Sequence, residues 1–276
     1  MRNIFFASFL FLFGFAYSAS ADTLEISTTD TLLSSVAEIR TPQRLNIYKQ
    51  RLRVLDDKTP MDLAYCEQVQ PFIESYVSKN KLLISRMQGL KKLYFPLFEE
   101  QLDKYGLPLE FKYLAIVESA LNPRAKSYSG ATGLWQFMYL TGKEFGLEVN
   151  SYLDERQDPL KSTQSACEYF IQLYDIFGDW NLVLAAYNGG PGYLQRKINS
   201  VGSYDFWELY PHLRKETRNY IPTFIAVNYV MNYADEHNIF PEFPDIKITK
   251  TDTLKIKKQV EINTIVEMLC VNKETI

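Results

Sequence analysis

Apolar residues recur at three- and four-residue steps along most of this chain, and this helical period restricts its fold more than any other feature. The period appears in a first long run that ends at Leu102 and in two later runs, from Ala166 to Phe177 and from Tyr220 to Ala234. No stretch before residue 245 alternates as a strand would, so the main body is predicted to be all-α. Gly106 stops the first long run as a helix C-cap would, and that run consists of Leu82, Leu83, Met87, Leu90, Leu93, Leu97 and Leu102.

The first 21 residues have the pattern of an export signal. Arg2 supplies a positive end, Ile4 to Phe15 are nearly all apolar, and Ala19-Ser20-Ala21 offers a cleavage site of small residues. The apolar run is shorter than a typical membrane span. We therefore expect residues 1–21 to be a signal peptide and the protein to be exported to the periplasm or cell envelope. A short retained anchor is the alternative.

Three further regions follow the signal. Residues 22–85 are predicted to be an N-terminal extension, which is polar and irregular to about residue 70 and helical from Pro71. Residues 86–240 form the predicted main domain, and prolines then mark a linker. Within 241–276, a strand over 253–258 and a short helix over 262–269 predict a small, incomplete α+β segment.

Composition excludes several classes of function. The net charge is −3 and no basic run stands out, so the electrostatic signature of nucleic-acid binding is missing. His212 and His237 lie far apart in sequence with no cysteine near either, so we expect no metal site and no cofactor. The three cysteines, Cys66, Cys167 and Cys270, cannot all pair within one chain. Acid–base chemistry would therefore use carboxylates.

One carboxylate interrupts an apolar helical stripe. Pro108 is expected to open a helix in which Phe111, Leu114, Ala115 and Glu118 are spaced i, i+3, i+4 and i+7. Burial at this position would raise the pKa of Glu118, so that it could donate a proton near neutral pH and lose that ability as pH rises. The alternative is a solvated or salt-bridged glutamate at a helix end.

Loops and turns surround this helix in the sequence. Residues 126–136 are small and are expected to form a surface loop near the Glu118 helix end. Asp158-Pro159 predicts the start of a helix that ends at Gly178. The run Asn188-Gly189-Gly190-Pro191-Gly192 requires a tight turn. Three acidic residues could offer a second carboxylate, but we interpret them as loop and capping residues: Asp154, Glu155 and Asp158.

Four motifs in order resemble the lytic transglycosylase family, in its membrane-bound D type with the soluble-transglycosylase catalytic domain. They are Glu118-Ser119, Gly133-Leu134-Trp135-Gln136-Phe137, Ala185-Ala186-Tyr187-Asn188-Gly189-Gly190 and the late Tyr220. The resemblance covers about residues 70–240 and implies a lysozyme-like helical catalytic domain. The segment from Gln259 to Leu269 resembles the first part of a LysM module, and a truncated or irregular end is the alternative.

The resemblance also implies roles. Glu118 matches the single catalytic acid and base of the family. The residues that match substrate-binding or site-shaping positions are Ser119, Gln136, Tyr187, Asn188 and Tyr220. For Ser119 the alternative is a helix cap. Trp135 departs from the methionine of many members, and its ring is expected either to stack on a sugar or to pack in the core.

The implied reaction is the non-hydrolytic cleavage of the β-1,4 bond between N-acetylmuramic acid and N-acetylglucosamine, which leaves a 1,6-anhydro end. The implied partner is the peptidoglycan glycan strand, with peripheral association to membrane or wall left open and a monomer expected. Two alternatives remain at this point: a goose-type lysozyme-like hydrolase of the same bond, and a non-catalytic wall-binding protein.

Overall fold

The computed structural model describes residues 44–243, 256 and 258–273, so the expected signal peptide lies outside the described residues. Within these ranges it contains helices and isolated bridges but no strand, which confirms the all-helical prediction for this part of the chain. The elements are α2 (Gln70–Ser78), α3 (Lys81–Lys104), η1 (Leu109–Tyr113), α4 (Leu114–Ser119), α5 (Tyr139–Glu144), η2 (Glu155–Gln157), α6 (Pro159–Phe177), α7 (Trp180–Gly189), α8 (Pro191–Val201), α9 (Phe206–Leu209), η3 (Tyr210–His212), α10 (Lys215–Asn232), η4 (Asp235–His237) and α11 (Ile262–Leu269).

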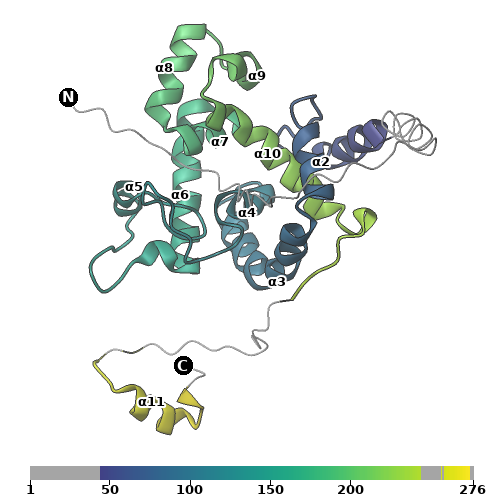
Figure 1. Cartoon of the computed structure of the whole chain (residues 1–276). Coiled ribbons are helices and arrows are strands. Elements are labelled where there is room, and N and C mark those ends of the chain that lie inside the picture. The colour runs from purple at the N-terminus through teal and green to yellow at the C-terminus, as the bar shows by residue number, and fades with distance from the viewer. Residues whose placement is uncertain (1–43, 244–255, 257, 274–276) are drawn as a thin grey trace, which may run out of the picture. The chain divides into compact units, whose positions relative to one another are not determined.

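Helix α10 forms the centre of the main body. Every residue from Tyr220 to Met231 is buried, and a helix that is apolar on all sides belongs inside a core. It packs against α2, α3, α4 and α7, which surround it in Figure 1. Tyr220 therefore lies in the helix against which these four helices pack.

The predicted limits of α6 are confirmed. The Asp158 side chain accepts a hydrogen bond from the Lys161 N–H at 2.8 Å, and Pro159 occupies the first turn. Gly178 closes the helix with a φ of 66°. The tight turn after α7 is also confirmed, because Gly190 has a φ of 89° and α8 starts at once with Pro191.

The predicted apolar face of α3 is partly wrong. Leu82 and Leu83 are 59% and 39% exposed, whereas Leu102 is fully buried as predicted. Phe98, which the predicted run did not include, is also fully buried, and the centroids of its ring and the Trp135 ring are 5.1 Å apart. Aromatic residues thus make part of the core contact that the predicted run assigned to leucines.

The N-terminal arm is not irregular throughout, as the polar composition had suggested. Residues 44–56 are helical. Tyr48 and Leu52, one helical turn apart, are buried, and the Tyr48 ring lies edge-on to Tyr229 of α10 with centroids 5.3 Å apart. Leu45, Tyr48, Leu52 and Leu55 recur at i, i+3, i+7 and i+10, a helical period that the polar composition of the arm had obscured.

The structure divides into two compact units, residues up to Pro244 and residues from Asp245 onward. In the second unit the predicted helix is confirmed as α11, Ile262–Leu269. The predicted strand over 253–258 falls mostly outside the described residues, so the resemblance to a LysM module stays a prediction. In the described ranges, no helix combines the length and apolar character that crossing a membrane requires.

Candidate active site

Glu118 stands where the stripe of apolar residues reaches the end of its helix. The segment begins as the 3-10 turn η1 rather than as α-helix and continues as α4. Phe111, Leu114 and Ala115 are fully buried, as the spacing predicted. Glu118 itself is half-buried, so its carboxyl group is anchored by the core and still reaches a surface.

Tyr220 from α10 donates a hydrogen bond from its hydroxyl to Oε1 of Glu118. Burial raises the pKa of Glu118 from 4.5 to about 7, and the negative charge of Glu216 adds to the rise, while the bond from Tyr220 opposes it. A carboxyl group with such a pKa can exist in either protonation state near neutral pH, which suits general acid and base catalysis.

Tyr187, on α7, comes close enough to Glu118 for the two groups to influence each other. Burial, followed by the negative charge of Glu118, holds the pKa of Tyr187 well above its usual value, so its hydroxyl stays protonated. That hydroxyl donates to the backbone oxygen of Trp135 at 2.6 Å. Three predicted residues, Glu118, Tyr187 and Tyr220, therefore meet from three different helices.

Ser119 and Gln136 make their polar contacts with the backbone. The Ser119 hydroxyl lies 2.9 Å from the carbonyl oxygens of both Ala115 and Leu134, so it ties the end of α4 to the following loop. The Gln136 amide nitrogen donates to the carbonyl oxygens of Gly133 at 2.9 Å and Ala125 at 3.2 Å. Ser119 thus has a visible positioning role.

Unusual backbone conformations flank Glu118. Among the described residues, five non-glycine positions have positive φ, and three of them border this site: Ala120 at 52°, Leu121 at 59° and Gln136 at 49°. Such conformations cost energy and tend to persist where function requires a particular shape. Their grouping supports a functional rather than a purely structural role for this region.

The structure corrects the prediction that residues 126–136 form a surface loop. Leu134 and Trp135 have no exposed surface. The Trp135 ring lies against Phe98 and Phe170, with centroids 5.1 and 5.8 Å away, and its N–H donates to the Thr163 hydroxyl at 2.9 Å. Trp135 is therefore a core aromatic residue, and its ring cannot stack on a sugar without refolding.

Five buried side-chain polar atoms in the described part of the chain have no hydrogen-bond partner, and two of them, Oδ1 of Asn188 and Oε1 of Glu216, belong to residues beside Tyr187 and Glu118. Buried polar atoms are normally paired, so unpaired acceptors next to a candidate site are notable. Sequence reasoning predicted Asn188 and missed Glu216. Its position one helical turn before Tyr220 was the available signal, because residues four apart share a helix face.

The acidic residues weighed as a second carboxylate have structural partners. Asp154 caps η2 and pairs with Arg156, Asp158 caps α6, and Glu155 pairs with Lys161. The interpretation as loop and capping residues is confirmed. In the described ranges, no three His, Cys, Asp or Glu side chains gather in a way that could hold a metal ion.

This geometry agrees with the comparisons to known proteins. Residues 96–210, which include Glu118 and Tyr187, match the family described as Transglycosylase SLT domain. The chain therefore contains a Transglycosylase SLT domain, and through this domain it is similar to the lytic transglycosylases.

Particular relatives extend the likeness beyond this domain. The chain is 29% identical over 219 residues to the membrane-bound lytic murein transglycosylase D of Escherichia coli, covering 78% of this chain and 46% of that protein. It is 32% identical to the soluble lytic murein transglycosylase of the same species, covering 51% of this chain and 23% of the relative.

A solved structure, the 70 kDa soluble lytic transglycosylase of Escherichia coli, aligns with a TM-score of 0.46 and 24% identity, over 61% of this chain and 31% of that one. The chain thus spans less than half the length of the two curated relatives.

Proposed function

We propose that this chain is a peptidoglycan lytic transglycosylase in which Glu118 acts first as acid and then as base. The hydrogen bond from Tyr220 to a half-buried Glu118 is the observation that carries the proposal. It holds one carboxyl group in place while burial keeps its pKa near 7. The names of the relatives in the SLT domain family supply the substrate class, the murein glycan strand.

The proposed reaction needs one carboxyl group because the substrate supplies the second participant. Glu118 protonates the oxygen between N-acetylmuramic acid and N-acetylglucosamine, and the acetamido group of the muramyl residue stabilises the positive charge that develops at C1. The resulting carboxylate takes the proton from the muramyl 6-hydroxyl, whose oxygen then bonds to C1. The products are a 1,6-anhydro end and a free 4-hydroxyl, and no water is consumed.

The surrounding residues support this scheme. Asn188 follows Tyr187 on α7, and Glu216 on α10 acts electrostatically on Glu118, so we place both side chains beside the proposed sugar site. Because the pKa of Tyr187 is raised well above its usual value, Tyr187 stays neutral and adds no negative charge beside Glu118. We further propose that the substrate lies along the loop that carries Gln136 and that the protein acts in the cell envelope.

The test is the chemical identity of the muramyl terminus. Purified peptidoglycan is digested with the full chain, and the soluble muropeptides are analysed by mass spectrometry. Anhydro ends, which weigh one water less than reducing ends, are expected. Reducing ends alone would show a lysozyme-like hydrolase, and binding without any release of muropeptides would show a non-catalytic wall-binding protein.

A further inference from the structure

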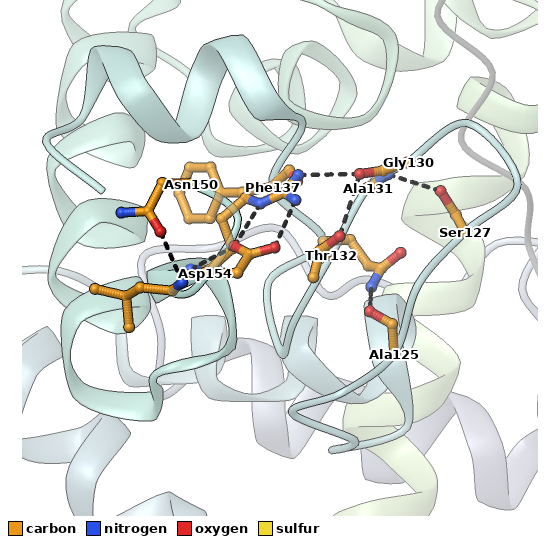
Figure 2. Close-up of polar contacts among 11 residues, drawn as sticks. Ala125, Ser127, Gly130, Ala131, Thr132, Phe137, Asn150 and Asp154 are labelled. Carbon is orange, nitrogen blue, oxygen red and sulfur yellow. Dashed lines mark hydrogen bonds and ion pairs between the residues drawn. The ribbon is translucent and has the colours of Figure 1, made fainter. Parts of the chain in front are cut away.

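A buried arginine connects the loop of the candidate site to the rest of the fold. Arg156 is only 6% exposed. Its Nε and Nη2 donate to the two oxygens of Asp154 at 2.8 and 2.7 Å. Its Nη1 donates to the backbone oxygens of Gly130 at 3.0 Å and Phe137 at 3.1 Å, and Figure 2 shows these contacts converging on one guanidinium group.

The backbone of Arg156 also lies close to the loop, at Gly133. A Cβ added to Gly133 would lie 1.8 Å from the backbone oxygen of Arg156. The chain at Gly133, which has a φ of 89°, therefore approaches Arg156 as closely as backbone allows. Side chain and main chain of one residue thus fix residues 130–137 at three points.

These residues provide the acceptors on which the site depends. The Thr132 and Phe137 backbones bond to each other at 3.0 and 3.1 Å and close a small loop. Inside this loop lie the carbonyl groups that accept from Ser119 and Tyr187, together with Gln136 in its left-handed conformation. A shift of the loop would move Gln136 and the carbonyl acceptors of Ser119 and Tyr187 relative to Glu118.

We infer that Arg156, oriented by Asp154, is a positioning residue that holds residues 130–137 and thereby places Gln136 and the carbonyl acceptors of Ser119 and Tyr187 around Glu118. A guanidinium is suited to this task because its planar fork pairs both Asp154 oxygens and still reaches two carbonyl groups. The effect on turnover rests on the proposed function, whereas the effect on the loop does not.

The experiment is amide hydrogen exchange of the full-length Arg156→Lys and Asp154→Asn variants. Lysine keeps the charge but lacks the planar fork that pairs both Asp154 oxygens while reaching two carbonyl groups, and asparagine removes the charge that orients the arginine. Exchange is expected to rise by about tenfold or more in peptides covering 130–137 and to stay unchanged in α7 and α10. Lys161→Met is the matched control, since it breaks the neighbouring pair between the exposed Lys161 and the buried Glu155 and should leave the loop unchanged.

Turnover gives the second readout. For Arg156→Lys, kcat on peptidoglycan is expected to fall by about 100-fold, the scale of a displacement near 1 Å in an active site, with little change in KM. The falling limb of the pH profile should not move, because Tyr220 and Glu216 still surround Glu118. In a double-mutant cycle with Gln136→Ala, the double variant should lose less kcat than the product of the two single losses, because both substitutions act on the same loop.

The outcomes separate the two proposals. Unchanged exchange over 130–137 in both variants overturns the inference, whatever happens to activity. Increased exchange throughout the main domain overturns it as well, because Arg156 would then serve general stability. A wild-type chain that releases no muropeptides, combined with a loop loosened selectively in the variants, refutes the proposed function and leaves the positioning role supported.

Discussion

Tyr220 and Glu118 are 102 positions apart in the chain, and the hydroxyl of the first donates to the carboxyl group of the second. The bond joins α10, the helix at the centre of the main body, to the half-buried end of α4. Two opposing effects meet at the carboxyl group: burial favours the protonated acid, and the tyrosine hydroxyl favours the carboxylate. A residue that must give and later take back a proton benefits from this balance.

Replacing Glu118 by glutamine should abolish turnover while preserving the fold. The amide cannot transfer the proton, so kcat for release of muropeptides should fall by about 10²–10⁴-fold, the usual contribution of general acid–base catalysis. Circular dichroism and binding to insoluble peptidoglycan should match the parent. A variant that releases anhydro muropeptides at the parental rate would place the catalytic group elsewhere.

The same substitution should change how stability depends on pH. With a folded-state pKa of about 7 against an ordinary value of 4.5, the folded protein retains between these pH values a proton that the unfolded chain has released. The free energy of unfolding therefore falls as pH rises through this window, by roughly 2–3 kcal/mol for this group. Urea unfolding at pH 5 and pH 8 should show Glu118→Gln gaining stability relative to the parent at the higher pH. Equal differences at the two pH values would contradict the raised pKa.

Tyr220→Phe should shift the pH profile upward. The bond from the hydroxyl lowers the pKa of Glu118, so its loss lets that pKa rise and moves the falling limb of activity to higher pH. Maximal kcat should drop by about 10–100-fold, since one bond that orients the carboxylate is lost. A profile that keeps its midpoint would show that the hydroxyl does not contact Glu118 in the working enzyme.

Glu216→Gln should shift the profile in the opposite direction. The charge of Glu216 helps to raise the pKa of Glu118, and the neutral amide removes this repulsion. The falling limb should move to lower pH. Glu208→Gln serves as the control, because Glu208 is exposed on α9 and is not among the charges that act on Glu118. An equal shift in both variants would point to net charge rather than to a local effect.

Sequence periodicity predicted α11, and it predicted α6, whose start and end are marked by the capping residues Asp158 and Gly178. The helix over residues 44–56 was overlooked, because charged and polar residues separate the apolar positions Leu45, Tyr48, Leu52 and Leu55 that give it a helical period. The stripe ending at Glu118 was predictable because three apolar neighbours share one helical face. The family resemblance pointed to Tyr220 as a site residue. Glu216 was missed although it lies one helical turn before Tyr220 on the same helix face.

The loop that carries Gln136 offers a matched pair of glycines for a final prediction. Gly130 and Gly133 have nearly the same φ, 88° and 89°, so alanine should cost about 1 kcal/mol of conformational strain at either position. Their surroundings differ: a Cβ at Gly130 meets nothing within 4 Å, whereas one at Gly133 would lie 1.8 Å from the backbone oxygen of Arg156. Gly133→Ala should therefore lose several kcal/mol more in urea unfolding, because main chain must move. Equal losses in the two variants would show that the loop can retreat from Arg156 without cost.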